Sequence, residues 1–173
     1  MTEAHAAPEL LSERLRLRAW RAADFEDFAA QYADEDAARF IGGPLDRALA
    51  WRKFASVIGH WALRGFGLYA LETREDARFV GACGLWMPES WPQLEIGYWL
   101  RPAQQGQGYA SEAVRRVREH AIGARGEREL VSYIVDANTP SRAVAERVGC
   151  RRDGELTLMG QRAGIYRHPV DPA

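Results

Sequence analysis

Two runs of residues decide the fold of this chain: Glu95-Ile96-Gly97-Tyr98-Trp99-Leu100 and Gln105-Gly106-Gln107-Gly108-Tyr109-Ala110. The first run, extended by Leu94, alternates along its length as a half-buried β-strand does. After the second run, apolar residues recur at helical spacing from Ala110 to Ala121, which predicts a helix ending near Gly123 or Gly126. The chain therefore passes from a strand through a glycine-rich turn into a helix.

This glycine-rich turn is suited to holding an anion. Two glycines let the backbone bend so that successive N–H groups point outward, and the first N–H groups of a helix have no acceptor within the helix. The same glycines also fit a tight connection that binds nothing. A dinucleotide-binding oxidoreductase is a third interpretation, but Ser111 stands where that motif expects its third glycine, and the turn lies past the middle of the chain.

The rest of the chain predicts a mixed sheet with flanking helices. Further strands are expected at 15–20, 67–73, 79–87 and 130–135, with two weaker candidates around Leu156 and Ile165. Further helices are expected at 24–32, 46–64 and 140–148. This order predicts an α/β (α+β) fold whose sheet is antiparallel in its first half, with one crossover around the glycine-rich turn.

The helix at 46–64 has recognisable ends and an expected buried face. Asp46 is placed to cap its N-terminus and Gly65 to end it. Its large apolar residues recur at helical spacing, and this set is expected to face the core: Trp51, Phe54, Ile58 and Trp61.

Composition narrows the classes of protein to which the chain can belong. Its 173 residues are 47% hydrophobic and 27% charged, which suits one globular domain, expected at 13–168 between tails at 1–12 and 169–173. The formal net charge is -1, so no nucleic-acid partner is expected. No apolar window is long enough for a membrane span and no signal sequence precedes the domain, so no membrane partner and a cytoplasmic location are expected.

The cysteines and histidines give no sign of a metal site. Cys83 and Cys150 both lie in apolar surroundings, so we expect two buried thiols and no disulfide. Their spacing does not match a metal-ligand set, and we predict no metal. His60 and His120 fall on predicted helices without an evident partner, and we interpret both as structural or solvent-facing.

Three blocks, in order and spacing, resemble the GNAT superfamily of N-acetyltransferases, most closely its branch of ribosomal-protein N-terminal (RimJ/RimL-like) acetyltransferases. The blocks are the strand at 95–100, the turn and helix start at 105–113, and residues 138–150, which include Asn138-Thr139-Pro140-Ser141. The resemblance extends from about Glu13 to Leu158. It implies an acyltransferase that moves an acetyl group from acetyl-CoA to a primary amine, on a small molecule or a protein N-terminus. Relatives are often dimers, so a homodimer stays open.

The resemblance also implies how the donor is bound. The sheet would splay open between the strand at 95–100 and the strand at 130–135, and the pantetheine arm of CoA would lie in the gap. The residues implied in donor binding are Tyr98, Trp99, Leu100, Gln105, Gly106, Gln107, Gly108, Tyr109, Ala110, Asn138 and Ser141. Asn138 also fits as the N-cap of the helix at 140–148. Arg101 and Arg142 lie beside these segments, where they would meet phosphates.

Two residues are our candidates for catalysis. The attacking amine must lose a proton, and Glu95, a carboxylate in an apolar strand, is the first choice as base, with Glu112 or a water chain as alternatives. Many relatives carry a Tyr acid where this chain has Ala145, whereas this branch often has a Ser at the position of Ser141. Ser141 is therefore the candidate acid or sulfur contact.

The sequence also bears on the path of the reaction, the acceptor pocket and the alternative function. Without a base beside either cysteine, direct attack of the amine on the thioester is expected rather than a covalent intermediate. Trp86 and Trp91 flank a loop that would wall the acceptor pocket. Because Ala145 replaces the usual acid, a CoA-binding module without transferase activity is the alternative function.

Overall fold

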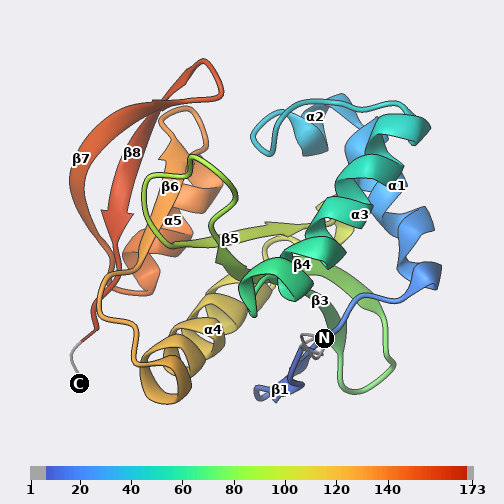
Figure 1. Cartoon of the computed structure of the whole chain (residues 1–173), viewed down its shortest axis with the longest axis horizontal. Coiled ribbons are helices and arrows are strands. Elements are labelled where there is room, and N and C mark those ends of the chain that lie inside the picture. Colours follow the sequence, from blue (N-terminus) through green and yellow to red (C-terminus); the bar gives the residue numbers. More distant parts are fainter. Residues whose placement is uncertain (1–6, 171–173) are drawn as a thin grey trace.

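A single sheet of eight strands runs through the structure, a computed structural model that describes residues 7–170 (Figure 1). Its strands are β1 (Leu10–Leu11), β2 (Leu15–Arg18), β3 (Leu68–Thr73), β4 (Phe79–Trp86), β5 (Glu95–Leu100), β6 (Val131–Val135), β7 (Arg151–Leu158) and β8 (Gln161–Arg167). They lie in the order β1-β2-β3-β4-β5-β6-β8-β7. Neighbours are antiparallel except for β5 and β6, which are parallel.

Five α-helices and two short 3-10 turns complete the described chain. The helices are α1 (Phe25–Ala33), α2 (Glu35–Ala38), α3 (Arg47–Arg64), α4 (Tyr109–Arg125) and α5 (Thr139–Arg147). The 3-10 turns η1 (Ala22–Asp24) and η2 (Pro102–Gln104) precede α1 and the glycine-rich turn. The mixed, mostly antiparallel sheet predicted from the sequence is confirmed, and so is the single crossover, β5–α4–β6. Helix α2 was not predicted. Among residues 7–170, no helix has the length and apolar character needed to cross a bilayer.

Alternate residues of β5 face two different helical layers. Trp99 packs with Phe28 of α1 and Phe54 of α3, whereas Ile96 packs with Val114 and other residues of α4. Accordingly, α1 and α3 lie together on one side of the sheet in Figure 1 and α4 lies on the other. Because successive side chains of a strand point to opposite faces, one strand carries residues into both layers.

The sheet begins earlier in the chain than the domain boundary expected at residue 13. Leu10 and Leu11 form β1, which pairs with Leu17 and Arg16 of β2, and the Leu10 side chain lies in the core. Residues 1–6 and 171–173 of the two expected tails lie outside the described part of the chain.

Helix α3 has the predicted ends but a different buried face. Asp46 accepts a hydrogen bond from the Leu49 N–H, and Gly65 ends the helix in the left-handed conformation. The buried residues include Ala50, Phe54, Val57 and Trp61, whereas Trp51 is 59% exposed and Ile58 is 41% exposed. The predicted stripe was wrong at Trp51 and Ile58. The predicted and the observed buried faces share Phe54 and Trp61. The prediction was wrong because it chose the larger side chains, Trp51 and Ile58, over Ala50 and Val57.

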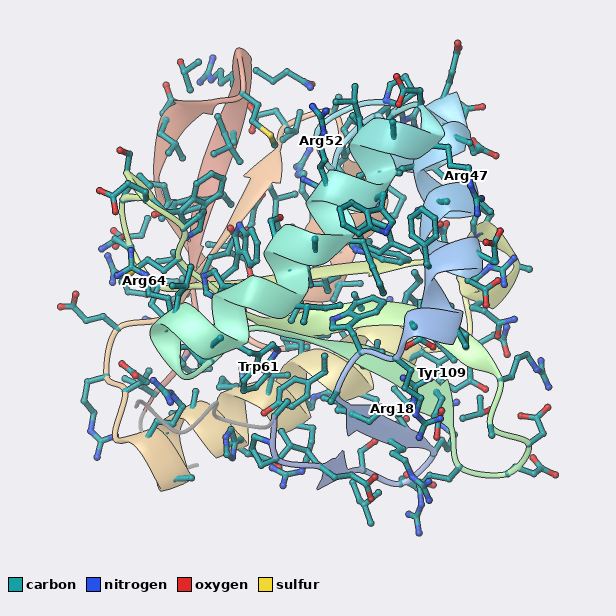
Figure 2. All side chains as sticks on the ribbon, turned by 45° about the vertical axis from the view of Figure 1, so that its right-hand side comes forward. Arg18, Arg47, Arg52, Trp61, Arg64 and Tyr109 are labelled. Carbon is teal, nitrogen blue, oxygen red and sulfur yellow. The ribbon has the colours of Figure 1, made fainter. Side chains whose placement is uncertain are left out.

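A buried ion cluster ties β2 to β3 and to the start of α1. The Arg18 guanidinium donates to both carboxylate oxygens of Asp24, at 2.8 and 2.9 Å, and to Glu72 Oε2 at 2.5 Å. All three side chains are buried. Figure 2 shows Arg18 beside the sheet and Arg47 on α3, where Arg47 pairs with the exposed Glu26. The two arginines therefore make carboxylate pairs at opposite extremes of burial.

Replacing Arg18 with Met is expected to lower the free energy of unfolding by about 3–5 kcal/mol, because it leaves buried Asp24 without its cation and leaves buried Glu72 only the more distant Arg16 and Arg21. Urea denaturation followed by circular dichroism measures this loss. The matched control, Arg47→Met, breaks a solvent-exposed pair and should leave the urea midpoint near that of the wild type. Equal midpoints for the two variants would contradict a stabilising role for the buried cluster.

Candidate active site

The site is built where β5 and β6 separate. These parallel strands pair at one register position, Glu95 opposite Val131, and the Val131 N–H donates to the Leu94 carbonyl at 3.1 Å. In a continuous parallel ladder, the next donor of β6, the Tyr133 N–H, would bond to the Ile96 carbonyl. That bond is absent between these described strands, and the ladder ends there.

Side chains replace the missing ladder bond on both strands. The Tyr133 N–H donates instead to Glu95 Oε1 at 3.3 Å, and the Ile96 carbonyl accepts instead from the Ser132 hydroxyl at 2.7 Å. An unpaired buried backbone group costs about as much free energy as a lost hydrogen bond. These two substitute hydrogen bonds therefore offset the cost of separating the strands. Glu95 and Ser132 thus satisfy the two backbone groups at the point where the strands begin to separate. We call this point the closed end of the gap.

Ser132 belongs to a buried hydrogen-bonded chain. Its hydroxyl lies 2.9 Å from His168 Nε2, and His168 Nδ1 lies 3.2 Å from Cys150 Sγ. Burial lowers the pKa of His168 to about 3, so this imidazole is neutral and one ring nitrogen donates while the other accepts. Since Ser132 gives its proton to Ile96, we assign the donor role to Nε2 and the acceptor role to Nδ1, which then receives the Cys150 S–H.

Both cysteines are buried thiols, as the sequence predicted. Cys83 and Cys150 are free and buried, and burial raises the pKa of the Cys150 thiol to about 11. Neither thiol is set up as a nucleophile. The residues that the structure describes contain no cluster of three or more His, Cys, Asp or Glu suited to a metal ion.

Beyond the closed end, the backbone of β5 faces the gap at every second residue. The Ile96 carbonyl points towards β6, so the backbone groups of Tyr98 and Leu100 share that direction. The Arg101 N–H bonds to Val80 of β4, so odd-numbered residues, including Trp99, direct their backbone groups to β4. Trp99 therefore borders the gap with its indole ring, and Tyr98 and Leu100 border it with backbone groups as well.

Two cavities meet at this gap. We call the first the turn-side cavity; it measures about 520 Å³ and lies between the glycine-rich turn, α5 and the segment of α2. The second, the aromatic cavity, measures about 300 Å³ and lies between α3, β5, β6 and the end of β7. Six residues border both cavities: Phe40, Ile41, Tyr98, Trp99, Asn138 and Ser141. A molecule that passes from one cavity into the other must cross these residues.

The glycine-rich turn presents unused N–H donors at the turn-side cavity. Gly106 and Gly108 have φ values of 75° and 84°, and Gly108 is the N-cap of α4. Within residues 7–170, the N–H groups of residues 106–111 have no protein acceptor. Arg14 fixes the turn from outside, because it donates to the Gln107 carbonyl at 2.9 Å and stacks on the Tyr109 ring. The turn is therefore a rigid cradle of donors, as an anion site requires.

Most residues predicted for donor binding border the turn-side cavity. These are Tyr98, Trp99, Leu100, Gln105, Gly106, Gly108, Ala110, Asn138 and Ser141. Gln107 and Tyr109 do not line it: the Gln107 side chain donates to the Ala103 carbonyl, and the Tyr109 ring lies under Arg14. Any contribution of these two residues to anion binding must come from their backbone N–H groups.

The arginines at this cavity differ from those expected. Arg101 pairs with Asp27, and Arg142 donates to the Asp136 carbonyl at 3.3 Å; neither borders the turn-side cavity. Arg39 and Arg147 border it instead. Sequence proximity to the turn pointed to Arg101, but its backbone N–H points to β4 as that of Trp99 does, so its side chain lies on the face of β5 that packs against α1.

Glu95 is buried at the end of the aromatic cavity and is 8% exposed. Its Oε2 accepts from the Trp91 indole N–H at 2.8 Å, while Oε1 accepts from Tyr133. Burial raises the pKa of the Glu95 carboxyl to about 7, although both N–H donors act in the opposite direction. Each oxygen keeps a second lone pair that can receive a proton from a bound molecule.

Glu112, the rival carboxylate, is committed elsewhere. It accepts from the Ser12 hydroxyl and the Arg14 backbone at 2.7 Å and from the Arg14 guanidinium at 2.8 Å. Burial alone would raise the pKa of the Glu112 carboxyl. The hydrogen bonds from Arg14 and Ser12 outweigh burial, so the pKa lies below its ordinary value. Glu112 therefore fastens the β1–β2 loop to α4 and does not line either cavity.

Asn138 and Ser141 lie together where α5 begins. Asn138 is the N-cap, because its Oδ1 accepts from the Ser141 N–H at 3.3 Å, and it also borders both cavities. The Ser141 carbonyl accepts from the Tyr98 hydroxyl at 3.0 Å. Within the described chain, the Ser141 hydroxyl has no protein partner in hydrogen-bond reach. Ala145 is buried in the core and borders neither cavity.

Several residues of the site were not predicted from the sequence. Trp86 and Trp91 line the aromatic cavity as expected, but Phe40, Lys53, Ser132 and further residues also line it. Ser132 is a polar residue in an otherwise apolar strand, and this was the one signal that could have identified it. His60 is structural, as expected: it stacks on Trp86 with the ring centroids 4.5 Å apart.

Replacing Ser132 with Ala should lower the free energy of unfolding by about 1–3 kcal/mol, because the Ile96 carbonyl and the His168 N–H both lose a buried partner. Urea denaturation of the purified variant measures the change. Ser56→Ala is the control, since the Ser56 hydroxyl is exposed and bonds only within α3. If the Ser132 variant unfolds like the wild type, the hydroxyl does not support the end of the ladder.

Comparisons with known proteins agree with this geometry. The family model described as an acetyltransferase (GNAT) domain matches residues 14–151. A curated relative, the uncharacterized N-acetyltransferase p20 of Bacillus licheniformis, is 24% identical over 150 residues, which cover 85% of this chain and 84% of the relative.

Solved structures share the fold over nearly the whole chain. The acetyltransferase from Agrobacterium tumefaciens str. C58 has a TM-score of 0.86 and 30% identity, with 95% of each chain covered. Mycobacterium smegmatis RimJ in complex with CoA-disulfide has a TM-score of 0.72 and 21% identity, covering 92% of this chain and 85% of that one. The family match, the 30% identical structure and the splayed strand pair lead to one conclusion: the chain belongs to the GNAT family of acetyltransferases.

Proposed function

We propose that this chain is an N-acetyltransferase that transfers an acetyl group from acetyl-CoA to a primary amine of a small molecule or a protein N-terminus. One observation carries the proposal: a cavity lined by a cradle of anion donors and a cavity lined by a buried carboxylate meet at the gap between β5 and β6. The first suits a phosphorylated donor and the second an amine acceptor.

The residues at the turn-side cavity fit CoA. Unused N–H groups at 106–111 would hold its diphosphate, and Arg39 or Arg147 would pair with its phosphates. The backbone groups of Tyr98 and Leu100 that face the gap would bond the pantetheine arm as an added strand does. When bound, acetyl-CoA would supply a thioester whose carbonyl carbon accepts the amine.

Two residues that border these cavities, Glu95 and Ser141, would assist the acetyl transfer. The amine nitrogen forms a bond to the acetyl carbon, the carbon–sulfur bond breaks with its electron pair on sulfur, and CoA leaves as a thiolate that takes up a proton from water. Glu95 would receive the proton that the amine loses, directly or through water, and its pKa of about 7 suits that role near neutral pH. The Ser141 hydroxyl would donate a hydrogen bond to the departing sulfur. A backbone N–H in the gap would stabilise negative charge as it develops on the carbonyl oxygen.

The direct test is incubation with acetyl-CoA and a broad panel of amines while the release of free thiol is followed. We expect release with at least one class of amine. CoA binding without release from any amine would favour the alternative, a binding module without transferase activity. Thermal denaturation covers the oxidoreductase interpretation: acetyl-CoA should raise the melting temperature and NAD(P) should not.

Replacing Gly108 with Val is expected to weaken CoA binding about tenfold, the loss of roughly one charge-assisted hydrogen bond. Valine disfavours the left-handed backbone conformation that residue 108 has, and its Cβ meets the Arg14 guanidinium, so we expect the donors of the turn to shift. Gly126→Val is the matched control at the other end of α4, also at positive φ but with open space around it. Titration calorimetry should show weaker binding for the Gly108 variant alone, and equal affinities would exclude the turn as the diphosphate site.

Replacing Glu95 with Gln should lower kcat/KM about 100-fold at about pH 8, because the amide cannot accept the proton. In the wild type, kcat/KM should fall as the pH drops through about 7, where Glu95 becomes protonated and stops acting as a base. The variant should lose this acid limb of the profile. Glu26→Gln, which alters an exposed carboxylate, is the control. An unchanged profile in the Glu95 variant would assign the base role elsewhere.

A further inference from the structure

The aromatic cavity is bordered by two charged side chains of the described chain, Glu95 on β5 and Lys53 on α3. Lys53 is also the only lysine in a sequence otherwise rich in arginine. Glu95 has a role in the proposed reaction, whereas Lys53 has none so far. A single cation in the wall of an acceptor cavity is a candidate for recognising part of the acceptor.

Lys53 lacks the ion pair that would explain its position. No carboxylate of residues 7–170 lies within ion-pair distance of its ammonium group, which instead lies 5.4 Å from the centre of the Tyr32 ring. The side chain is partly buried, and burial lowers the pKa of the Lys53 amine below its ordinary value. A partly desolvated cation whose contact is an aromatic ring and not a carboxylate keeps part of its desolvation cost, and a bound anion would relieve that cost.

The other walls of this cavity are mostly apolar. Trp86 and Trp91 lie on the side of the β4–β5 loop, and Phe28 and Val57 belong to α1 and α3. With a volume of about 300 Å³, the cavity is at the small end of the range for small-molecule sites. It therefore suits a compact molecule with an apolar body and one anionic group.

We propose that the acceptor is a free amino acid with an apolar or aromatic side chain, whose carboxylate pairs with Lys53 while its amine faces the junction of the two cavities. This inference rests on the proposed transferase function and narrows it. The apolar side chain packs among the indole and phenyl rings of the wall. A protein N-terminus fits less well. The α-carboxylate of its first residue is part of a peptide bond, so no anion would be present to pair with Lys53.

Three amines that differ only at the carboxylate test the proposal: phenylalanine, phenylalanine amide and phenethylamine. Wild-type kcat/KM, measured by thiol release, should be at least about tenfold higher for phenylalanine than for the other two, as one ion pair in a partly buried site requires. The amide is the less basic amine, so its ionisation favours it as a nucleophile. A preference for phenylalanine therefore reports the carboxylate.

Variants of Lys53 assign the preference to this side chain. Lys53→Met should raise KM for phenylalanine about tenfold and leave phenethylamine nearly unchanged, and Lys53→Arg should restore most of the loss because it keeps the charge. Arg52→Met is the control. Arg52 lies on the same helix, α3 (Figure 2), but it is exposed and does not border the cavity.

The outcomes separate this inference from the proposed function. If the amide or a peptide N-terminus reacts as well as phenylalanine, the inference is wrong although the chain is a transferase. The same holds if Lys53→Met lowers the rates of all three amines equally, because the ammonium group then acts only on structure. If no amine releases thiol with the wild type, the proposed function fails and the inference fails with it.

Discussion

The structure depends on how a parallel pair of strands can end in the middle of a sheet. Opening β5 from β6 leaves the Tyr133 N–H and the Ile96 carbonyl without each other, and both residues are buried. The Glu95 carboxylate and the Ser132 hydroxyl each satisfy one of these groups, at 3.3 and 2.7 Å. Since buried backbone groups must be paired, these two side chains stabilise the point where the strands separate.

The same constraint links architecture to chemistry. Glu95 closes the ladder and also borders the aromatic cavity, so the group that ends the strand pairing is the group whose pKa burial raises to about 7. Ser132 is supported in turn by His168, which comes from the end of the described chain and reaches Cys150. A neutral imidazole between a hydroxyl and a thiol adds no charge near Glu95. The closed end of the gap is therefore firm without a second ionised group.

Much of the fold could be predicted from the sequence because the relevant signals are local. The strand–turn–helix unit, the Asp46 cap and the Gly65 stop each depend on residues within a few positions of one another. The buried face of α3 could not be predicted, because two stripes share Phe54 and Trp61 and only the sheet selects between them. Arg101 illustrates the same limit: it is near the turn in sequence, yet it pairs with Asp27 on α1.

The sequence by itself determined most of the elements, their order and the glycine-rich turn, since hydrophobic period and turn chemistry act over short distances; it did not reveal β1 or α2. Together with the pattern at Asn138, these were enough to indicate the family. The tertiary structure alone decided which polar side chains share one enclosed space. Ser132 meets His168, and Lys53 of α3 borders the cavity that Glu95 enters from β5, because packing in three dimensions unites residues far apart in the chain. No periodicity in the sequence records such a meeting.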